Sequence, residues 1–327
     1  MVGIAAFSSI EFDGIVLSVP TGYVSGTALS DMAVYSGRTF ASLVVTPGTY
    51  VWTWGTGANQ NFTLQILPAI LPATNITNIS TRALVSAGQY QAIAGFTITG
   101  TEPKQVVIRG LGPTLTNLIT HRVLADPMLG LYDGSGTLIF SNNDWKDTQQ
   151  TAIEATGLAP SFDVESAILI PLQPGKYTAI LSGYPGGLLL PIGLVEVYDI
   201  NPGVSAELTN VSTRGLVLGG DGVIIGGFIS DGSTQVVVRG LGPTLAQFGV
   251  GGALANPVVS LFDGNGNLVS TNNNWKDTQQ TAIQATGLAP PNELEAAILA
   301  PVAAGNYTAI LSGNGGGTGI GLIEVYK

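Results

Sequence analysis

The sequence predicts an all-β protein, with a small N-terminal β unit followed by two tandem β-sandwich domains of jelly-roll type that contain short helical crossovers. Short runs rich in Val, Ile and Tyr alternate with breaks that contain Gly, Asn and Pro, which is typical of strands joined by tight turns. Glycine occupies 45 of 327 positions, about twice its usual share of about 7%. A long segment is also repeated within the chain.

The composition excludes several classes of protein. Hydrophobic residues make up 45% of the chain and charged residues only 10%, which favours collapse over disorder. Eleven basic residues stand against 21 acidic ones, for a net charge of -10, so we expect no nucleic acid partner. No apolar stretch approaches the roughly 20 residues of a membrane helix, and we expect no membrane insertion. The absence of cysteine excludes disulfides and thiolate metal sites.

The internal repeat is the strongest feature of the sequence. Residues 142–160 read NNDWKDTQQTAIEATGLAP and residues 272–290 read NNNWKDTQQTAIQATGLAP, with 17 of 19 positions identical. Flanking motifs extend the match: STR at 80 and 212, RGLGPTL at 109 and 239, YTAILSG at 177 and 307, and EVY at 196 and 324. Each copy of about 120 residues exceeds the roughly 20–50 residues of a solenoid repeat. We therefore expect each copy to be an independent domain with its own core.

This alignment gives the predicted boundaries. They are an N-terminal unit at 1–70, a linker at 71–77, a first sandwich at 78–200, a linker at 201–209 and a second sandwich at 210–327. The spacing of equivalent residues falls from 132 at Arg82/Arg214 to 130 at Arg109/Arg239 and 128 at Glu196/Glu324. Copy two is therefore shorter at two places, which we expect to be loops.

Turns and helices can be placed within each copy. DGSG at 133–136 and DGNG at 263–266 lie between apolar runs and supply the positive φ that hairpin turns require. Asp147 is expected to cap a helix that ends at Gly157, and Asp277 to do the same in copy two. The prolines of the two GLGPTL motifs suit the first position of a second short helix.

The first 70 residues match neither copy, yet they contain strand patterns. Alternating apolar residues at 15–19 and the alternation of Tyr50, Trp52 and Trp54 indicate strands. Because a period of two places residues on one face of a strand, these three aromatic side chains form a candidate interface or ligand surface.

Several motifs together resemble a known repeat. STRALV, GFTITG, VVIRGLGPTL, GLAP followed by ESAIL, YTAILSG and GLVEVYD resemble a repeat of large secreted bacterial proteins, over residues 78 to 327. That repeat is similar to the bacterial pre-peptidase C-terminal type of β-sandwich, an accessory module carried outside the cell beside enzymes and adhesins. The segments VPTGYVSGTALSDMAVYSG and TPGTYVWTWGTGANQNFTLQIL are similar to regions upstream of PEP-CTERM sorting anchors. The resemblance implies a non-catalytic role outside the cell or at its surface.

Catalytic patterns are absent from the sequence. His121 is the only histidine and has no counterpart in copy two, and no G-x-S-x-G motif is present to supply a serine nucleophile. Carboxylates recur at Asp133/Asp263, Asp147/Asp277, Glu165/Glu295 and Glu196/Glu324. We interpret them as turn, cap and arginine-pairing residues rather than as the acid and base of a glycosidase. The sequence therefore predicts a protein that is not an enzyme.

Asp133, Asn142, Asp144 and Asp147 are a candidate calcium site, because their hard oxygen atoms would converge across a hairpin. Copy two has Asn274 in place of Asp144, and the spacing matches no EF-hand. We therefore expect no cofactor, with calcium as the alternative.

The residues as a whole predict a structural protein of the bacterial cell exterior, a subunit of a self-assembling fibre or matrix. Its expected partners are further copies of itself or other matrix components, and the region from Ile4 to Val19 is expected to pair with a neighbour's sheet edge by strand addition. The alternative is a glycan- or calcium-dependent binding module. In that case Trp145 and Trp275 would join the N-terminal aromatic residues as contact surfaces, although a tryptophan before a helix also suits a core position.

Overall fold

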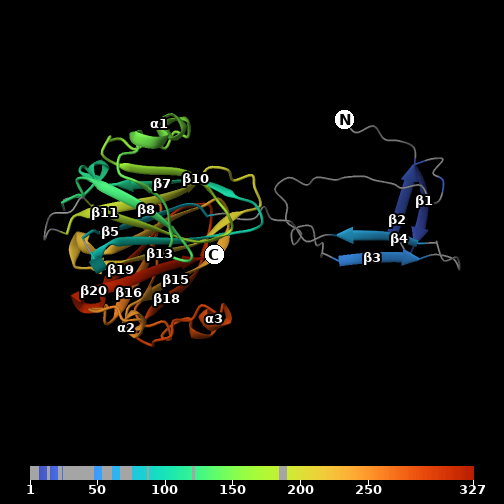
Figure 1. The fold of residues 1–327 in the computed structure, drawn as a ribbon. Coiled ribbons are helices and arrows are strands. Elements are labelled where there is room, and N and C mark those ends of the chain that lie inside the picture. The colour runs from blue at the N-terminus through green and yellow to red at the C-terminus, as the bar shows by residue number, and fades with distance from the viewer. Residues whose placement is uncertain are drawn as a thin grey trace. The chain divides into compact units, whose positions relative to one another are not determined.

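The chain divides into two units, Met1–Ile70 and Leu71–Lys327, both drawn in Figure 1. The computed structural model describes residues 7–12, 15–20, 24, 48–53, 61–66, 76–86, 88–119, 122–183 and 190–327. Strands dominate these residues and the helices are short, which confirms the all-β class.

The first unit contains two antiparallel hairpins. Strand β1 (Phe7–Phe12) pairs with β2 (Ile15–Pro20), and β3 (Gly48–Thr53) pairs with β4 (Asn61–Ile66). The two strands predicted in this region are therefore present. Tyr50 lies in β3 and is 37% exposed, whereas Trp54 and the side chain of Trp52 lie outside the described residues.

The second unit contains eight strands from each copy. Those of copy one are β5 (Ile76–Leu84), β6 (Ala92–Thr99), β7 (Lys104–Leu111), β8 (Pro127–Asp133), β9 (Leu138–Asn142), β10 (Ser166–Leu172), β11 (Gly175–Gly183) and β12 (Ile192–Asp199). Those of copy two are β13 (Glu207–Val217), β14 (Ile224–Ser230), β15 (Thr234–Leu241), β16 (Pro257–Asp263), β17 (Leu268–Asn272), β18 (Ala296–Val302), β19 (Gly305–Gly313) and β20 (Gly319–Tyr326). The two length differences between the copies fall between strands, before β7 and β15 and before β12 and β20, as predicted.

The strands form two layers that each run through both copies. One layer has the order β10, β7, β12, β5, β14, β19, β16, β17. The other has the order β18, β15, β20, β13, β6, β11, β8, β9. Each layer takes four strands from copy one and four from copy two. The layers face each other, since a Cβ on Gly110 in β7 would lie 2.8 Å from Leu129 Cγ in β8 and 2.9 Å from Leu181 Cδ1 in β11.

The prediction of two independent sandwich domains was therefore wrong. Phe96 of copy one and Phe228 of copy two belong to the same buried cluster, so the copies share a core. The reason is that a single copy would leave the edges of β5 and β6 open, and each edge is closed by a strand of the other copy. This pairing also extends β5 to Ile76 and β13 to Glu207, inside the segments predicted as linkers, because Ile76 faces Ser230 and Glu207 faces Thr99.

The seam between the copies is closely packed around a local two-fold axis. Thr81 and Thr213 are equivalent residues, and their buried Oγ1 atoms lie 2.7 Å apart. A residue that contacts its own counterpart must lie beside the axis. Glycine allows the strands to approach on either side: a Cβ on Gly95 would lie 2.3 Å from Ser212 Oγ, and a Cβ on Gly227 would lie 2.3 Å from Ser80 Oγ.

Short helical elements lie between strands. They are η2 (Gly88–Tyr90), η3 (Pro113–Leu115), α1 (Lys146–Ala155), η4 (Gly220–Gly222), α2 (Pro243–Gln247), α3 (Gln280–Ala285) and η5 (Asn314–Gly316). Helices α1 and α3 lie at opposite ends of the second unit (Figure 1). No helix within the described ranges is both long and apolar enough to cross a membrane.

The predicted helix stop and start residues are confirmed, but the predicted caps are wrong. Gly157 has φ +73° after α1, and Pro113 and Pro243 begin η3 and α2. Asp147, however, lies inside the first turn of α1 and no side chain caps that helix. Helix α3 begins three residues after Asp277. The chain is already fixed before the helix by the buried Trp145, whose backbone N–H donates to Glu165 O at 2.9 Å.

The Thr81–Thr213 contact predicts a specific pattern of stability. Thr81→Val keeps the shape of the side chain but leaves the Thr213 hydroxyl buried without a partner, so we expect the free energy of unfolding to fall by about 1–3 kcal/mol. Thr81→Val with Thr213→Val removes both hydroxyls and should recover most of that loss. Chemical denaturation of the three proteins tests this. Additive losses in the double variant would show that the two hydroxyls do not interact.

Candidate functional site

Of the four residues predicted to bind calcium, Asn142, Asp144 and Asp147 lie close together before and at the start of α1, where the backbone N–H of Asp147 donates to Asp144 O at 3.0 Å, whereas Asp133 lies apart from them. In the β8–β9 hairpin Asn142 faces Leu129, four residues before Asp133, so Asp133 and Asn142 lie at opposite ends of the hairpin. The carboxylate of Asp133 accepts hydrogen bonds from Ser135 and Thr137, which lower its pKa. Asn142 donates to Asp144 O at 3.0 Å and accepts from Ala167 N at 2.9 Å. Asp133 and Asn142 therefore both have structural partners, and Asp133 does not lie with the other three predicted ligands.

Acidic clusters of the kind that usually hold metals are missing from the part of the chain that the structure describes. No three or more His, Cys, Asp and Glu side chains are grouped there in a way that could hold a metal ion. His121 lies outside the described residues.

Trp145 and Trp275 are core residues. Each is only 4% exposed, so neither ring is available to stack on a sugar, and the prediction of a contact surface at these two residues was wrong. Trp145 packs with Ile153 and Ala167, and its indole N–H donates to Phe162 O at 3.1 Å. The equivalent bond from Trp275 goes to Asn292 O at 3.0 Å. The rings anchor α1 and α3 against the outer face of the sheets.

Glu165 and Glu295 fasten the GLGPT turns to the chain that follows each helix. Glu165 is completely buried, and its carboxylate accepts from Gly112 N at 3.0 Å and from Thr114 N and Oγ1 at 2.8 and 2.6 Å. Glu295 makes the same three contacts in copy two. These are backbone and hydroxyl donors, not the arginines that the sequence suggested. A buried carboxylate satisfied in this way has a structural role.

Arg109, Glu196 and Tyr198 form a cluster that recurs as Arg239, Glu324 and Tyr326. Arg109 donates to Glu196 from Nε at 2.9 Å and also from a terminal nitrogen, while its guanidinium lies 5.0 Å from the centre of the Tyr198 ring. Another nitrogen donates to Leu158 O at 3.1 Å, which ties the segment after α1 to the sheet. The predicted pairing of these arginines and glutamates is confirmed. Burial, and then the charge of Glu196, raises the pKa of Tyr198 to about 12.

Arg82 lies at the seam between the copies. One terminal nitrogen donates to Asp221 O in the β13–β14 connection at 3.2 Å, so this arginine of copy one contacts copy two. Its Nε is buried and has no hydrogen-bond partner among the described residues, and the same is true of Nε in Arg214. Burial lowers the pKa of Arg82.

Several buried side-chain oxygens accept no hydrogen bond from a described residue, and none of them belongs to the four residues predicted from the sequence to bind calcium. They are Oδ1 of Asp126 and Asn143 in copy one and Oδ1 of Asn256, Asn273 and Asn274 in copy two. Asp126 was missed because it lies 17 residues before Asn143 in the sequence. The signal that could have found it is the repetition of Asp126-Pro127 as Asn256-Pro257.

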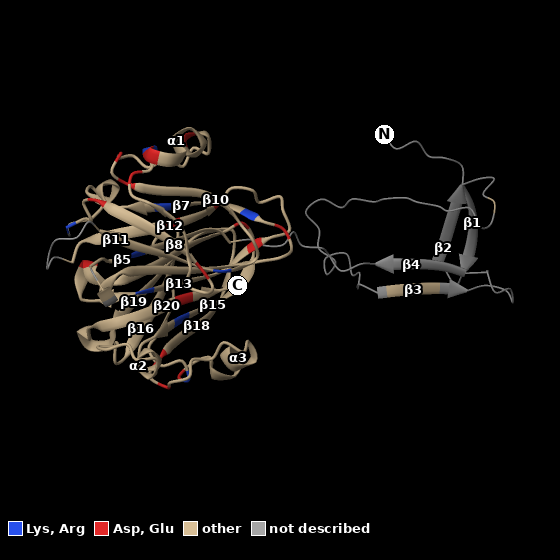
Figure 2. Ribbon diagram, viewed as in Figure 1, with Lys and Arg blue, Asp and Glu red and all other residues tan. Residues whose placement is uncertain are grey.

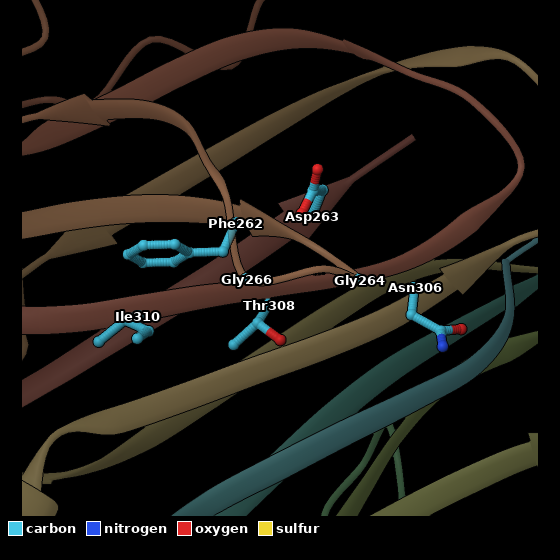
Figure 3. A pocket seen from close by; sticks show the side chains of 7 residues that line it. All are labelled: Phe262, Asp263, Gly264, Gly266, Asn306, Thr308 and Ile310. Carbon is cyan, nitrogen blue, oxygen red and sulfur yellow. The ribbon is translucent and has the colours of Figure 1, made fainter.

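A shallow pocket of about 360 Å³ lies on the outer face of copy two, beside the β16–β17 turn. It is lined by Phe262, Asp263, Gly264, Gly266, Asn306, Thr308 and Ile310 (Figure 3). Asp263 in its wall is engaged by the backbone and side chain of Asn267 at 2.9 and 3.0 Å. Most of the ribbon of the second unit carries no charged residue, and the charged residues occur in small groups such as the one beside α1 (Figure 2). Asp263 is the one ionisable residue among those that line this pocket.

Comparison with known proteins identifies no family. No family model matches the sequence, and no curated protein matches it. Among solved structures, the chain is similar to a DUF4785 family protein from Legionella pneumophila subsp. pneumophila str. Philadelphia 1, with a TM-score of 0.23 and 11% identity over 91% of this chain and 71% of that one. It is also similar to the STIV MCP, with a TM-score of 0.22 and 12% identity over 85% of this chain and 93% of that one.

The Glu165 contacts predict that a conservative substitution of this residue strongly lowers the stability of the protein. Glu165→Gln places an amide N–H₂ against hydroxyl and backbone donors, so we expect the free energy of unfolding to fall by about 3 kcal/mol. Glu154→Gln is the matched control, because Glu154 is exposed and accepts only from Gln150, and should change stability by less than about 0.5 kcal/mol. Urea denaturation compares the two. Equal effects would contradict the role of Glu165.

The tyrosines of the two arginine clusters predict a loss of stability at high pH. The pKa of a tyrosine in the unfolded chain is about 10, and it is about 12 for Tyr198 and Tyr326 in the folded protein. Folding therefore favours the protonated phenol, and this contribution is complete below pH 10 and lost as the pH rises toward 12. Tyr198→Phe with Tyr326→Phe should flatten the fall in the free energy of unfolding over this interval, and parallel curves would refute the assignment.

Proposed function

We propose that this chain is a non-catalytic structural protein of the bacterial cell exterior that assembles with further copies of itself through the edge strands β9 and β17. The resemblance of its repeats to secreted bacterial modules supports the location. The structural contacts of the recurrent carboxylates support a role without catalysis, because Asp133, Glu165 and Glu196 are each held by neighbouring groups.

The main support for this proposal is that strands β9 and β17 form exposed edges of the sheets. Among the described strands, β9 pairs only with β8 and β17 pairs only with β16, so each leaves one row of backbone N–H and C=O groups unpaired. Leu138 and Ile139 in β9 are 51% and 37% exposed, and Leu268 and Val269 in β17 are 55% and 41% exposed. An edge strand that combines open hydrogen-bonding groups with exposed aliphatic side chains favours pairing with another chain.

The position of these edges suits an assembly that grows in two directions. The other two layer ends, β10 and β18, have backbone N–H groups that donate to side chains of the segments before and in the helices. Strands β9 and β17 come from different copies, so one molecule presents two equivalent exposed edges related by the local two-fold axis. A subunit with two like edges can join a neighbour at each of them, and contacts that do not close into a ring produce a filament. Pairing of the β1–β2 hairpin with a neighbour's edge is a second way to use the same surfaces.

A glycan-binding function is supported less well. Trp145 and Trp275 are buried, which leaves Tyr50 as the described member of the predicted contact residues. No contact of a described residue points to a sugar.

The edge contact is tested by charge. Leu138→Lys with Leu268→Lys places a lysine on each edge, where it opposes strand pairing, and should raise the concentration at which assembly begins by at least tenfold. The unfolding free energy should change by less than about 0.5 kcal/mol for each exposed position. Light scattering and electron microscopy over a concentration series measure the assembly.

Two further variants of the protein complete this test. Leu118→Lys is the control, because Leu118 is 74% exposed but follows η3 rather than lying on an edge strand, and it should assemble like the original protein. Deletion of residues 1–20 distinguishes the two ways of pairing, since only addition of the β1–β2 hairpin requires that segment. A chain that remains monomeric at every concentration, or edge variants that assemble normally, would contradict the proposed function.

A further inference from the structure

Lys104 and Asp199 form an ion pair that is buried between the layers of copy one. Their side chains are each only 1% exposed, and Lys104 Nζ lies 2.8 Å from Asp199 Oδ2. Lys104 begins β7 and Asp199 ends β12, and these strands are neighbours in which Asp199 faces Val106. Val106 and Val197, each two residues along the strand, belong to the buried core cluster. Because alternate residues share a face of a strand, both charged side chains point into the core.

Burial makes the ionised form of this pair unfavourable. Removing an ammonium and a carboxylate from water is costly, and their mutual attraction offsets only part of that cost. Transfer of one proton from Lys104 Nζ to Asp199 Oδ2, along their hydrogen bond, gives a neutral amine and a carboxylic acid, the forms that burial favours. A desolvated lysine amine is a nucleophile. Here it lies beside the carboxyl carbon with which an amine forms an amide.

The backbone of Asn201 holds both reacting groups. Its carbonyl oxygen accepts a hydrogen bond from Lys104 Nζ at 3.2 Å, which fixes the position of the nitrogen. Its N–H donates to Asp199 Oδ1 at 3.0 Å, and Oδ1 is the oxygen that becomes negative when an amine adds to Cγ. A backbone N–H that is aimed at a developing negative charge stabilises the intermediate of such a reaction.

The segment that follows Asp199 is fastened to β7 by its backbone. Ile200 N donates to Gln105 O at 3.1 Å, and Gln105 N donates to Asn201 Oδ1 at 2.9 Å. The amine and the carboxyl are therefore held in contact by neighbouring, hydrogen-bonded backbones. Fixed proximity of this kind raises the effective concentration of one reacting group around the other to as much as about 10⁵–10⁸ M.

We propose that Lys104 and Asp199 condense in the folded protein to an amide that joins β7 to β12 covalently. The neutral Nζ attacks Cγ of the protonated carboxyl, and negative charge develops on Oδ1. The nitrogen then gives its surplus proton to the Oδ2 hydroxyl, which leaves as water while Oδ1 forms the amide carbonyl. One C–N bond forms and one C–O bond breaks, and the step requires no oxidant or other reactant. This inference does not depend on the proposed assembly, because the bond lies within one molecule.

Copy two lacks this pair and serves as an internal comparison. Thr234 and Lys327 stand at the positions of Lys104 and Asp199. Lys327 pairs instead with Glu207 at 2.9 Å, and these two side chains are 18% and 25% exposed. Because both ions remain in contact with water, their charged forms are solvated and the neutral forms are not favoured. We therefore expect one amide for each chain, confined to copy one.

The test measures the intact mass of the purified full-length chain after prolonged incubation under native conditions. We expect the mass to fall by that of one water molecule for each chain, and a protease digest to contain a branched peptide that joins Lys104 to Asp199. The linked chain should also run faster on a denaturing gel, because the bond closes residues 104–199 into a loop that remains in the unfolded state. A sample kept in denaturant throughout should retain its full mass, since its two reacting groups are then apart.

Two variants separate this amide from other losses of water. Lys104→Met with Asp199→Leu replaces the buried ion pair by apolar residues of similar size, a change that folded proteins often tolerate, and it should keep the full mass. Lys104→Arg keeps the positive charge but has no amine that can become neutral, and it should also stay unlinked. The proposal fails if the folded original chain keeps its full mass. It also fails if the Lys104→Met/Asp199→Leu variant loses water to the same extent, because the loss would then arise elsewhere, such as at an Asp-Gly sequence.

Discussion

Pairing of β5 with β14 and of β13 with β6 is the contact on which the second unit depends. These pairs close the open edges of each copy and join four strands from one copy to four from the other in both layers. They also place hydrophobic side chains of both copies in one core, because Phe96 and Phe228 pack in the same cluster. The arrangement resembles a homodimer whose two subunits have been joined into one chain. Its interface is made of continuous sheet, so we expect the two copies to unfold together.

Local features could be predicted from the sequence, and the arrangement of the copies could not. The turns at Asp133 and Asp263 were predicted correctly because glycine and Asx chemistry act within four residues. The fit of Gly95 against Ser212 involves residues more than a hundred positions apart, and neither residue indicates a partner by itself. The helix start could not be predicted for the same reason. The sequence position of Asp147 suits a helix cap, yet the buried Trp145 determines where the helix begins. Burial of that ring depends on the sheet beneath it.

The two copies share their main structural contacts but differ in charge at several equivalent positions. The Glu165 and Arg109 contacts recur in copy two with nearly the same distances, because they hold the crossover segments against the sheets. Asp126 and Asp144, by contrast, correspond to Asn256 and Asn274 in copy two, a difference that preserves the shape of the side chain and removes its charge. Lys104 and Asp199 form a buried ion pair at 2.8 Å in copy one alone, since Thr234 and Lys327 take their places in copy two. The two copies thus have the same backbone structure but different charged residues at equivalent positions.

That buried ion pair also lies beside the connection between the copies. Strand β12 ends at Asp199 and β13 begins at Glu207, and Lys104 holds the start of this connection by donating to Asn201 O at 3.2 Å. A short, fastened connection keeps copy two at a high effective concentration next to copy one of the same molecule. The identical seam can in principle form between copies of different molecules, which is domain swapping. Because Lys104, Asp199 and Asn201 all lie on the copy-one side of the connection, their contact fixes its start and leaves residues 202–206 as the hinge at which the two forms would differ.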